Sequence, residues 1–537
     1  MRTTVFIVAA FLLISSASCS SILDDLSKIF NDKVKSATFA AAADLIKEDF
    51  NYQRKHNAAA DMNTCIMTDA SSCDISSLPY GNSTLVIVPP PSNEIPDVTK
   101  PQCIFGEPYG FQVIPGDKNK VLVYFQGGGA CWDQITVDAG MCTTSAVPND
   151  PVGVFDRINP KNPFKDYTIV HFLYCSGEVW SGQTVSSYSY DGKPAVQVGI
   201  VNAKYTINWM KRQISLGLLG NNNAPAAITL NHKYVFDEFV GMGCSAGSVG
   251  IQMWSDQLIS TFPSQQMAIV PDSYAGVFPP NTVGPLMKTF GLCGSNLIAS
   301  SLVQSCNAGT LSIEDVMLVN IQKYPNIPFA YIQSKIDAIQ QSFYITLGLT
   351  TRGASAFITP ALFYDGVNSI FGTYNALPNF AVYLVDGPMH CFTCLDIMYK
   401  TTNYGPLGKR DMLKKDTPLD RWVGQFPLRK GQSVLTECVG DVEDSKSSKL
   451  DAEAAEKPHG HDHDHDHSNK EKKRGHDHDQ EESDQEHEGE NLNSRIKKLG
   501  DSISGKFTHW IKNAIPAFNA KTKYCSDTVF PKTFTQA

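Results

Sequence analysis

The chain has 537 residues, of which 42% are hydrophobic and 18% charged, and its formal net charge is −9. This length and composition are typical of one large or two ordinary globular domains, and they exclude a fibrous or wholly disordered protein. The acidic charge is local, because residues 441–490 hold 18 acidic and 7 basic residues. The rest of the chain is nearly neutral, which argues against a broad basic face and against nucleic acid as a partner.

Residues 1–19 have the pattern of a secretory signal peptide. Arg2 precedes an apolar stretch from Val5 to Ile14, and small residues follow up to Cys19. This stretch is too short to span a bilayer and no other segment approaches that length, so we expect a secreted protein without stable membrane insertion. Fourteen cysteines fit an oxidising compartment, and Asn82-Ser83-Thr84 is a glycosylation sequon.

Residues 20–95 are expected to form an N-terminal helical leader. Apolar residues recur at helical spacing from Ile22 to Val34, and the alanine-rich stretch from Phe39 to Leu45 continues the pattern. Both a pro-segment and a helix packed on the outside of the protein are compatible with this pattern. The run Pro89-Pro90-Pro91 marks the boundary with the next region.

Residues 96–440 alternate between short apolar runs and helical segments, which predicts an α/β-hydrolase-like domain with a mostly parallel central sheet flanked by helices. Each predicted strand is followed by a polar or glycine-rich turn. The six predicted strands are 121–125, 167–174, 234–240, 267–270, 327–332 and 380–385.

The third predicted strand leads into Gly243-Cys244-Ser245-Ala246-Gly247, and a segment with helical apolar spacing follows. A serine at such a strand-to-helix turn is the nucleophile elbow of an α/β-hydrolase. The tight turn forces strained backbone angles on Ser245, so only small residues fit at Gly243 and Gly247. Gly250, one turn later, would let the helix lie close to the sheet. Because G-x-S-x-G also arises by chance, the motif needs support from the rest of the chain.

A serine hydroxyl becomes a good nucleophile only when a histidine takes its proton and a carboxylate orients that histidine. In α/β-hydrolases these residues follow the chain order serine, acid, histidine, and this chain offers Ser245, Asp337 and His390, each after an apolar run. Asp272 also ends a predicted strand and is the alternative acid. Two other candidates are excluded by their positions, the mid-strand core residue His171 and the turn residue Asp386.

The glycine run from Gly127 to Gly129 follows an earlier strand, where the second half of an oxyanion hole belongs. Its bare N–H groups, together with that of Ala246 after the nucleophile, would face the substrate oxygen. Each such donor would stabilise the tetrahedral intermediate by about 3 to 4 kcal/mol.

Disulfides are expected to brace the loops around this site. Two pairs flank short loops, Cys131 with Cys142 and Cys293 with Cys306. Cys391 is expected to pair with Cys438 or Cys525, and Cys244 is a candidate for a free thiol. The spacing of Cys391-Phe392-Thr393-Cys394 also fits a redox pair, but in a secreted hydrolase a structural disulfide that fixes the histidine loop is favoured.

Five motifs in order carry a family resemblance. They are Gly127-Gly128-Gly129-Ala130-Cys131-Trp132, Tyr174-Cys175-Ser176, Gly243-Cys244-Ser245-Ala246-Gly247, Asp337, and His390-Cys391. Together they resemble the pectin acetylesterase/Notum family over roughly Gln102 to Cys394. The resemblance implies Ser245 as nucleophile, His390 as base and Asp337 as the residue that orients it. It also implies an oxyanion hole formed by Gly128, Gly129 and Ala246.

The chain departs from the family at two positions beside these motifs. Gln126 stands where the family usually has a glutamate, and Ser248 stands where it usually has a glycine. Neither is a triad member, so the differences concern local packing and substrate preference. The plant branch of the family deacetylates pectin, and Notum removes a fatty acyl group from Wnt proteins.

We therefore expect a secreted serine carboxylesterase that needs no metal or cofactor. The expected substrate is an acetyl ester on an extracellular polysaccharide such as pectin. The alternative substrate is a lipidated protein that loses a longer acyl chain, and the depth of the acyl pocket would separate the two.

Residues 441–490 are polar and of low complexity, so we expect a disordered insertion. Alternating histidine and aspartate offer loose zinc or copper ligands, which makes a metal buffer the alternative function from another class. The candidate ligands are His459, His461, His463, His465 and His467. Residues 491–537 are expected to form a C-terminal helix and a tail that dock on the catalytic domain.

Overall fold

The structure is a computed structural model that describes residues 35–47, 62–91, 96–221, 234–352, 357–401, 418–425, 433–435 and 533–535. The predicted signal peptide, the histidine-rich insertion with its candidate metal ligands, and the predicted C-terminal helix lie outside the described residues. At the end of the chain, Thr533–Thr535 (β13) pairs antiparallel with Ser433–Leu435 (β12).

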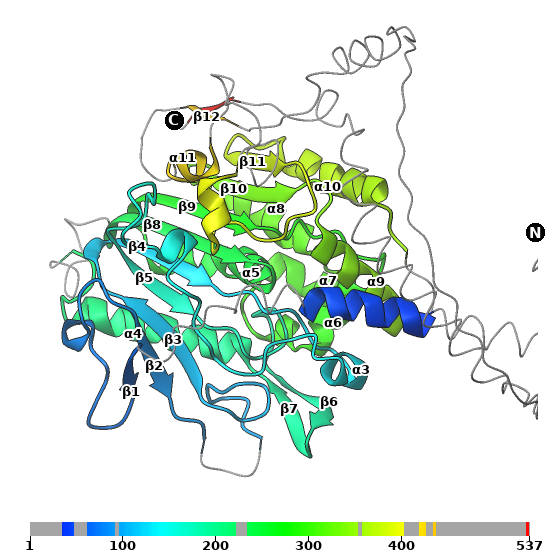
Figure 1. Cartoon of the computed structure of the whole chain (residues 1–537), viewed down its shortest axis with the longest axis horizontal. Helices are drawn as coiled ribbons and strands as arrows, with labels where there is room; N and C mark the ends of the chain where they lie inside the picture. The colour runs from blue at the N-terminus through cyan, green and yellow to red at the C-terminus, as the bar shows by residue number, and fades with distance from the viewer. Residues whose placement is uncertain are drawn as a thin grey trace, which may run out of the picture.

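A nine-stranded sheet forms the centre of the molecule (Figure 1). Its strands are β1 Asn63–Ile66, β2 Thr84–Val88, β3 Tyr109–Ile114, β4 Asp117–Phe125, β5 Tyr167–Phe172, β8 Phe236–Cys244, β9 Ser264–Asp272, β10 Phe329–Ser334 and β11 Phe380–Val385. Their spatial order is β1-β2-β3-β5-β4-β8-β9-β10-β11. From β5 to β11 every neighbouring pair is parallel, whereas β3 is antiparallel to both β2 and β5. The predicted α/β-hydrolase-like architecture is confirmed.

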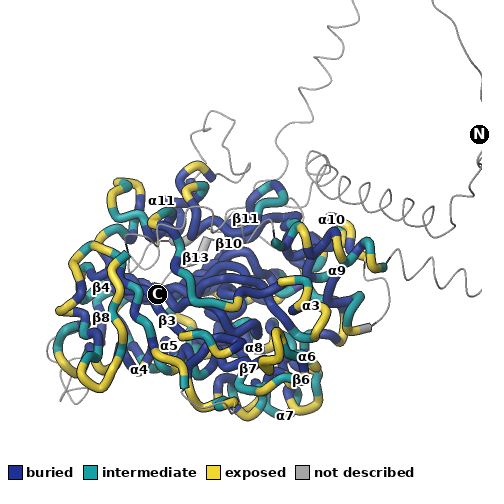
Figure 2. Tube along the Cα trace, turned by 60° about the horizontal axis from the view of Figure 1, so that its bottom comes forward, coloured by how far each residue is buried: buried dark blue, intermediate teal, exposed yellow. Residues whose placement is uncertain are grey.

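Both faces of the sheet are covered by a hydrophobic core. Successive residues of a strand point to opposite faces, so neighbouring residues belong to different cores. In β4, Val123 and Phe125 belong to the core on one face, whereas Leu122 and Tyr124 belong to the core on the other. β5, β10 and β11 are buried along their length, and β4, β8 and β9 are buried over their carboxyl-terminal halves (Figure 2). Burial on both sides explains why these strands are nearly continuous apolar runs in the sequence.

Helices of different sizes cover the two faces of the sheet. The first face packs against α4 Gly199–Ser215, α5 Ala246–Thr261, α8 Ile313–Lys323 and α10 Pro360–Tyr374. The second face packs against shorter segments, η3 Gly153–Phe155, η6 Asp396–Tyr399 and α11 Leu419–Val423. The remaining elements surround the carboxyl ends of the strands: α3 Gln134–Asp138, the hairpin of β6 Thr184–Tyr190 and β7 Lys193–Gln197, α6 Val283–Thr289, α7 Val303–Ala308 and α9 Ala338–Arg352.

The region expected to be a helical leader contains two strands of the main sheet. Only residues 35–47 of its described part form an α-helix, whereas β1 and β2 extend the edge of the sheet. The physical reason is the run Thr84-Leu85-Val86-Ile87-Val88, in which branched side chains favour a strand and alternate residues are buried. The predicted leader therefore ends well before residue 95.

The helix at residues 35–47 packs against the core of the molecule. Ala42 and Ile46 are fully buried. Ile46 belongs to the same core cluster as Ala130 and Phe343, two residues that also line the candidate site. Burial of this helix face stabilises the loops beside the site through the hydrophobic effect.

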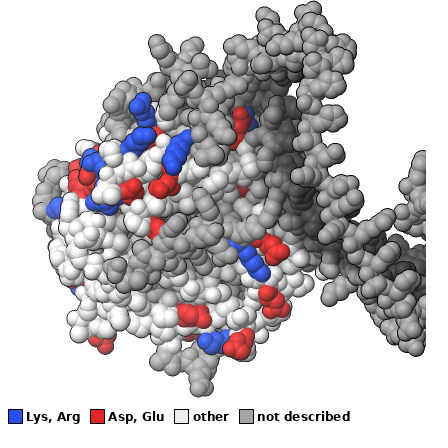
Figure 3. Space-filling model, in the orientation of Figure 1, with Lys and Arg blue, Asp and Glu red and all other residues white. Residues whose placement is uncertain are grey.

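The visible surface carries basic and acidic side chains side by side, with large uncharged areas between them (Figure 3). This agrees with the nearly neutral balance of the chain outside residues 441–490. Across the part of the chain that the structure describes, no helix combines the length and apolar character needed to cross a bilayer.

Candidate active site

Ser245 lies at the sharp turn between β8 and α5. Its backbone angles are φ 58° and ψ −124°, a region that residues with a side chain rarely adopt and that costs energy. A Cβ atom at Gly243 would overlap the carbonyl oxygen of Gly247, and one at Gly247 would overlap that of Phe125. At Gly250 a Cβ would lie 2.5 Å from the Trp180 ring. The predicted need for small residues around the elbow is confirmed.

The structure brings the predicted acid and the predicted base together. His390 Nδ1 lies 2.7 Å from Asp337 Oδ2, and both side chains are buried. Asp337 directly precedes α9, and the Gln340 N–H donates to Asp337 Oδ1 at 2.9 Å. The Gln340 side-chain amide donates to Oδ2, also at 2.9 Å. Donors at a helix N-terminus fix the orientation of this carboxylate.

Asp272, the alternative acid, faces a different set of groups. Its Oδ2 accepts hydrogen bonds from the Phe392 N–H at 2.9 Å and from the Thr393 N–H at 2.7 Å. The Thr393 hydroxyl donates to the same oxygen at 2.7 Å. The carboxylate thus holds the loop that follows His390, while Asp337 is the one that contacts the imidazole.

A disulfide between Cys244 and Cys391 joins the elbow to the histidine loop, with 5.7 Å between the two Cα atoms. These cysteines directly precede Ser245 and directly follow His390. Two predictions are therefore wrong: Cys391 does not pair with Cys438 or Cys525, and Cys244 is not a free thiol. The reason is that the loop after β11 folds back across the carboxyl ends of the strands and places Cys391 over the end of β8.

The Cys391–Cys394 spacing does not form a pair in this structure. Instead the sulfur of buried Cys394 lies within 4.8 Å of the sulfurs of Cys244 and Cys391. The two disulfides predicted across short loops, Cys131–Cys142 and Cys293–Cys306, are confirmed. Two further pairs are present, Cys65–Cys73 and Cys103–Cys175. The five disulfides among the described residues fit the oxidising compartment that the sequence predicts.

The glycine run lies directly against the elbow. A Cβ atom at Gly127 would be 2.7 Å from the carbonyl oxygen of Cys244 and 2.9 Å from Ser245 Cβ, so only glycine allows this approach. Gly128 and Gly129 have φ values of 150° and 74°. The N–H groups of Gly128, Gly129 and Ala246 donate to no acceptor among the described residues. All three are thus available to an oxygen atom of a substrate.

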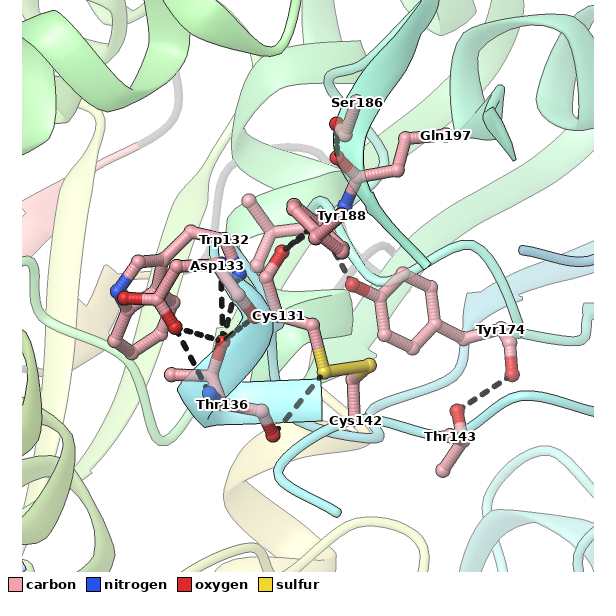
Figure 4. Close-up of a disulfide and its surroundings, with 11 residues drawn as sticks. Cys131, Trp132, Asp133, Thr136, Cys142, Thr143, Tyr174, Ser186, Tyr188 and Gln197 are labelled. Carbon is pink, nitrogen blue, oxygen red and sulfur yellow. Dashed lines mark hydrogen bonds between the residues drawn. A yellow bond between two sulfur atoms is a disulfide. The ribbon is translucent and has the colours of Figure 1, made fainter. Parts of the chain in front are cut away.

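The Cys131–Cys142 disulfide anchors the loop that continues from the glycines (Figure 4). The Tyr188 hydroxyl and the Gln197 amide both donate to the Cys131 carbonyl, at 2.9 and 3.0 Å. Asp133 accepts from the Thr136 N–H and caps α3 just beyond the loop. These contacts hold the backbone of the loop after Gly127 to Gly129 in place.

The Gln126 side chain makes three hydrogen bonds beside the glycine run. Its side-chain oxygen accepts from the Tyr174 N–H at 2.9 Å. Its amide nitrogen donates to the Val147 carbonyl at 2.8 Å and to Asn149 Oδ1 at 2.7 Å. A glutamate would have no N–H groups for these two acceptors, so the amide suits this site.

A narrow apolar cavity of about 40 Å³ opens beside Ser245. Its wall is formed by side chains from several elements: Trp132, Val179, Val249, Tyr274, Phe278, Val283, Leu286, Met287, Phe290, Phe343 and Leu347. Gly129 and Ala246 also border it. A cavity of this kind receives the apolar part of a ligand and places its polar end at the serine.

Asp386 is more than the turn residue expected. Its Oδ1 lies 2.7 Å from Lys335 Nζ, and the Lys335 side chain is only 2% exposed. Burial raises the pKa of Asp386 and the nearby ammonium opposes that rise. This ion pair joins the loop that carries Asp337 to the loop that carries His390. Sequence reasoning missed it because it concerns two residues that each follow a different strand.

His171 lies within β5, one residue before its end, and is fully buried. Its Nδ1 is 2.7 Å from Gln112 Oε1, and burial lowers its pKa to about 3. It is therefore a neutral core histidine, as predicted.

Glu178 is a buried carboxyl group in the loop after β5 that the sequence did not single out. The Ser176 hydroxyl donates to its Oε1 at 3.0 Å. Burial raises the pKa of Glu178 from 4.5 to about 7, and the Ser176 hydroxyl opposes this effect. Between about pH 4.5 and pH 7, Glu178 is protonated more often in the folded state than in the unfolded state. The free energy of unfolding therefore falls as the pH rises through this range.

Glu178→Gln should remove this decline because glutamine has a similar shape and no titrating group. From pH 4.5 to 7.5 the variant is expected to gain about 3 kcal/mol relative to the wild type. Urea unfolding at a series of pH values measures the difference between the two proteins. If the free energy of unfolding changed with pH in the same way in both proteins, Glu178 would keep an ordinary pKa in the folded state.

No protein-family model matches the sequence, and no curated protein matches it. Among solved structures, the chain is similar to the Wnt deacylase Notum from Drosophila, with 17% sequence identity and a TM-score of 0.39. The match covers 59% of this chain and 89% of that chain.

Proposed function

We propose that this protein is a serine carboxylesterase with Ser245 as nucleophile, His390 as general base and Asp337 as the residue that orients the base. The observation that carries the proposal is the covalently joined pair of loops, in which the Cys244–Cys391 disulfide holds the strained elbow beside the Asp337–His390 hydrogen bond. A serine, a histidine and a carboxylate assembled in this chain order support acyl transfer.

The first half of the reaction forms an acyl-enzyme. His390 takes the proton of the Ser245 hydroxyl, and the serine oxygen attacks the ester carbonyl carbon. The N–H groups of Gly128, Gly129 and Ala246 stabilise the negative oxygen of the tetrahedral intermediate. The bond to the alcohol then breaks, and His390 gives its proton to the leaving oxygen. Asp337 stays ionised and holds the imidazolium.

The second half of the reaction restores the enzyme. His390 takes a proton from a water molecule, whose oxygen attacks the carbonyl carbon of the acyl-serine. The intermediate collapses, the bond between Ser245 and the acyl group breaks, and the serine oxygen regains its proton from His390. The products are a carboxylic acid and an alcohol.

The cavity beside Ser245 is lined mostly by apolar side chains, so it favours an acyl group with an apolar chain. We propose a short acyl group such as acetyl, with the longer chain of a lipidated protein as the alternative. We further propose that the alcohol belongs to an extracellular polysaccharide and that the protein is secreted.

A series of p-nitrophenyl esters tests both the activity and the acyl length. We expect kcat/KM to be highest for acetate to butyrate and to fall for octanoate and palmitate. Met287→Ala should raise the octanoate-to-acetate ratio of kcat/KM about 10-fold or more, because Met287 is a buried part of the cavity wall. Met210→Ala is the matched control, since Met210 is equally buried but lies in α4, outside the cavity wall.

Palmitate as the best wild-type substrate would favour the long-chain alternative. The same shift of chain length in Met210→Ala and Met287→Ala would mean that lost stability, not cavity size, changes the preference. No hydrolysis of any ester by folded protein would contradict the esterase proposal itself.

A further inference from the structure

We propose that Asp272 is a positioning residue that sets the place of His390 relative to Ser245. The inference rests on the proposed esterase function and concerns the same site. It assigns a role to a buried carboxylate that touches neither the imidazole nor the cavity and that the reaction steps above do not use.

Asp272 is connected to the nucleophile through its backbone. It is the last residue of β9 and lies beside Cys244 in the parallel register of β8 and β9. The Ser245 N–H donates to the Asp272 carbonyl at 3.1 Å. This bond is made at the strained residue itself, so Asp272 helps to fix the elbow.

The same residue is connected to the base through its side chain. Its Oδ2 accepts three hydrogen bonds, from the Phe392 N–H and from the N–H and hydroxyl of Thr393. Its Oδ1 accepts from the Ser273 hydroxyl at 2.7 Å. The Ser273 oxygen in turn accepts from the Cys391 N–H at 2.9 Å. Asp272 and Ser273 therefore bind all three residues that follow His390 along the chain.

A carboxylate is the side chain that this arrangement requires. Asp272 is fully buried, and burial raises its pKa, whereas the donors from Thr393, Ser273 and Phe392 oppose that rise. Burial of an anion is costly unless hydrogen bonds compensate it, and here four donors converge on one group. An asparagine would bring no negative charge to these four donors, and its NH2 group would replace the oxygen that accepts from the Ser273 hydroxyl.

The Cys244–Cys391 disulfide does not make this carboxylate redundant. The disulfide limits the distance between the two loops, but the torsions of its side chains still allow the backbone to rotate. Cys391 has a φ of 65°, a left-handed conformation that needs support from its surroundings. The hydrogen bonds to Ser273 and Asp272 supply that support on the residue next to the base.

Asp272→Asn and Thr393→Val test the proposal in the full chain with p-nitrophenyl acetate. Asp272→Asn should lower kcat about 100-fold with KM within about twofold, because misplacement of a catalytic group affects the chemical step. Thr393→Val keeps the shape of the side chain, removes the hydroxyl that donates to Asp272 and lies 3.0 Å from the Tyr124 hydroxyl, and should lower kcat about 5-fold. Asp420→Asn is the control, because Asp420 is a buried aspartate on α11 that makes no hydrogen bond to the residues of the site, and its kcat should stay at the wild-type value.

The pH profile distinguishes positioning from a direct role as the acid. In Asp272→Asn the acid limb of kcat/KM should keep its wild-type midpoint, since Asp272 does not contact the imidazole. In Asp337→Asn the midpoint should move to lower pH, because the imidazolium loses its carboxylate partner. A midpoint that moved equally in Asp272→Asn would overturn the positioning role.

A folded Asp272→Asn variant with the wild-type kcat would also overturn the positioning role of Asp272. If Asp272→Asn does not fold, Thr393→Val decides, and an unchanged kcat there contradicts the proposal. Ser245→Ala separates this failure from that of the proposed function. An inactive Ser245→Ala beside a fully active Asp272→Asn rejects the role of Asp272 alone, whereas an active Ser245→Ala rejects the esterase mechanism.

Discussion

Ser245→Ala is expected to lower kcat for ester hydrolysis by about 10⁶-fold, as in other enzymes in which serine, histidine and acid act as a unit. The variant lacks the oxygen that forms the acyl-enzyme, and no other step replaces it. Its thermal unfolding midpoint should stay close to that of the wild type, because alanine fills almost the same buried space. The strained φ of 58° at this position remains in both proteins.

Ser248→Ala is the matched control for this prediction. Ser248 is also a fully buried serine, it lies three residues further on in α5, and its hydroxyl accepts from Gln252 at 3.4 Å. It does not line the cavity, so its loss should leave turnover within about 2-fold of the wild type. Equal activity in Ser245→Ala and Ser248→Ala would show that the nucleophile lies elsewhere. Covalent labelling by a fluorophosphonate gives the second measurement, since it should occur in Ser248→Ala and not in Ser245→Ala.

Asp337→Asn is expected to lower kcat by about 10⁴-fold, because an amide can donate to His390 Nδ1 and so stabilise the wrong tautomer. In the wild type the carboxylate accepts from Nδ1 at 2.7 Å and is held on both oxygens by Gln340. The hydrogen bonds from Gln340 hold the carboxylate in the orientation in which it accepts from the imidazole. Steady-state kinetics from pH 5 to 10 measure both the loss of kcat and the position of the acid limb.

The direction of the pH effect follows from charge. A carboxylate next to the imidazolium favours the protonated histidine, so its removal lowers the pKa of the base. The acid limb of Asp337→Asn should therefore lie at lower pH than that of the wild type. A mild effect in Asp337→Asn together with a shifted acid limb in Asp272→Asn would reverse the two assignments.

The residues of the candidate site could be predicted from sequence because each has a local signal. Ser245 follows a strand and precedes a helix between glycines, and β11 begins and ends at the predicted residues 380 and 385. Apolar runs that are buried on both faces identify parallel strands without knowledge of their neighbours. Since the carboxyl ends of such strands meet at one edge, the chain order of serine, acid and histidine follows from the sequence alone.

Edge strands gave weaker signals. β1 is mostly exposed, and only alternate residues of β2 are fully buried, so neither resembles the continuous apolar runs of the centre. β1 pairs with β2, and β2 pairs with β3. This pairing with residues further along the chain determines their structure, so the helical leader predicted for residues 20–95 does not extend over them.

The tertiary structure alone decided how the loops meet. Cys244 and Cys391 are 147 residues apart, and no sequence spacing indicates that they pair. Both Asp272 and Asp337 end strands, so only the path of the loop after β11 determines which carboxylate contacts His390 and which one holds the backbone beside it. The acyl cavity likewise gathers side chains from Trp132 to Leu347. Its size depends on packing between elements, a property that no single segment of the sequence contains.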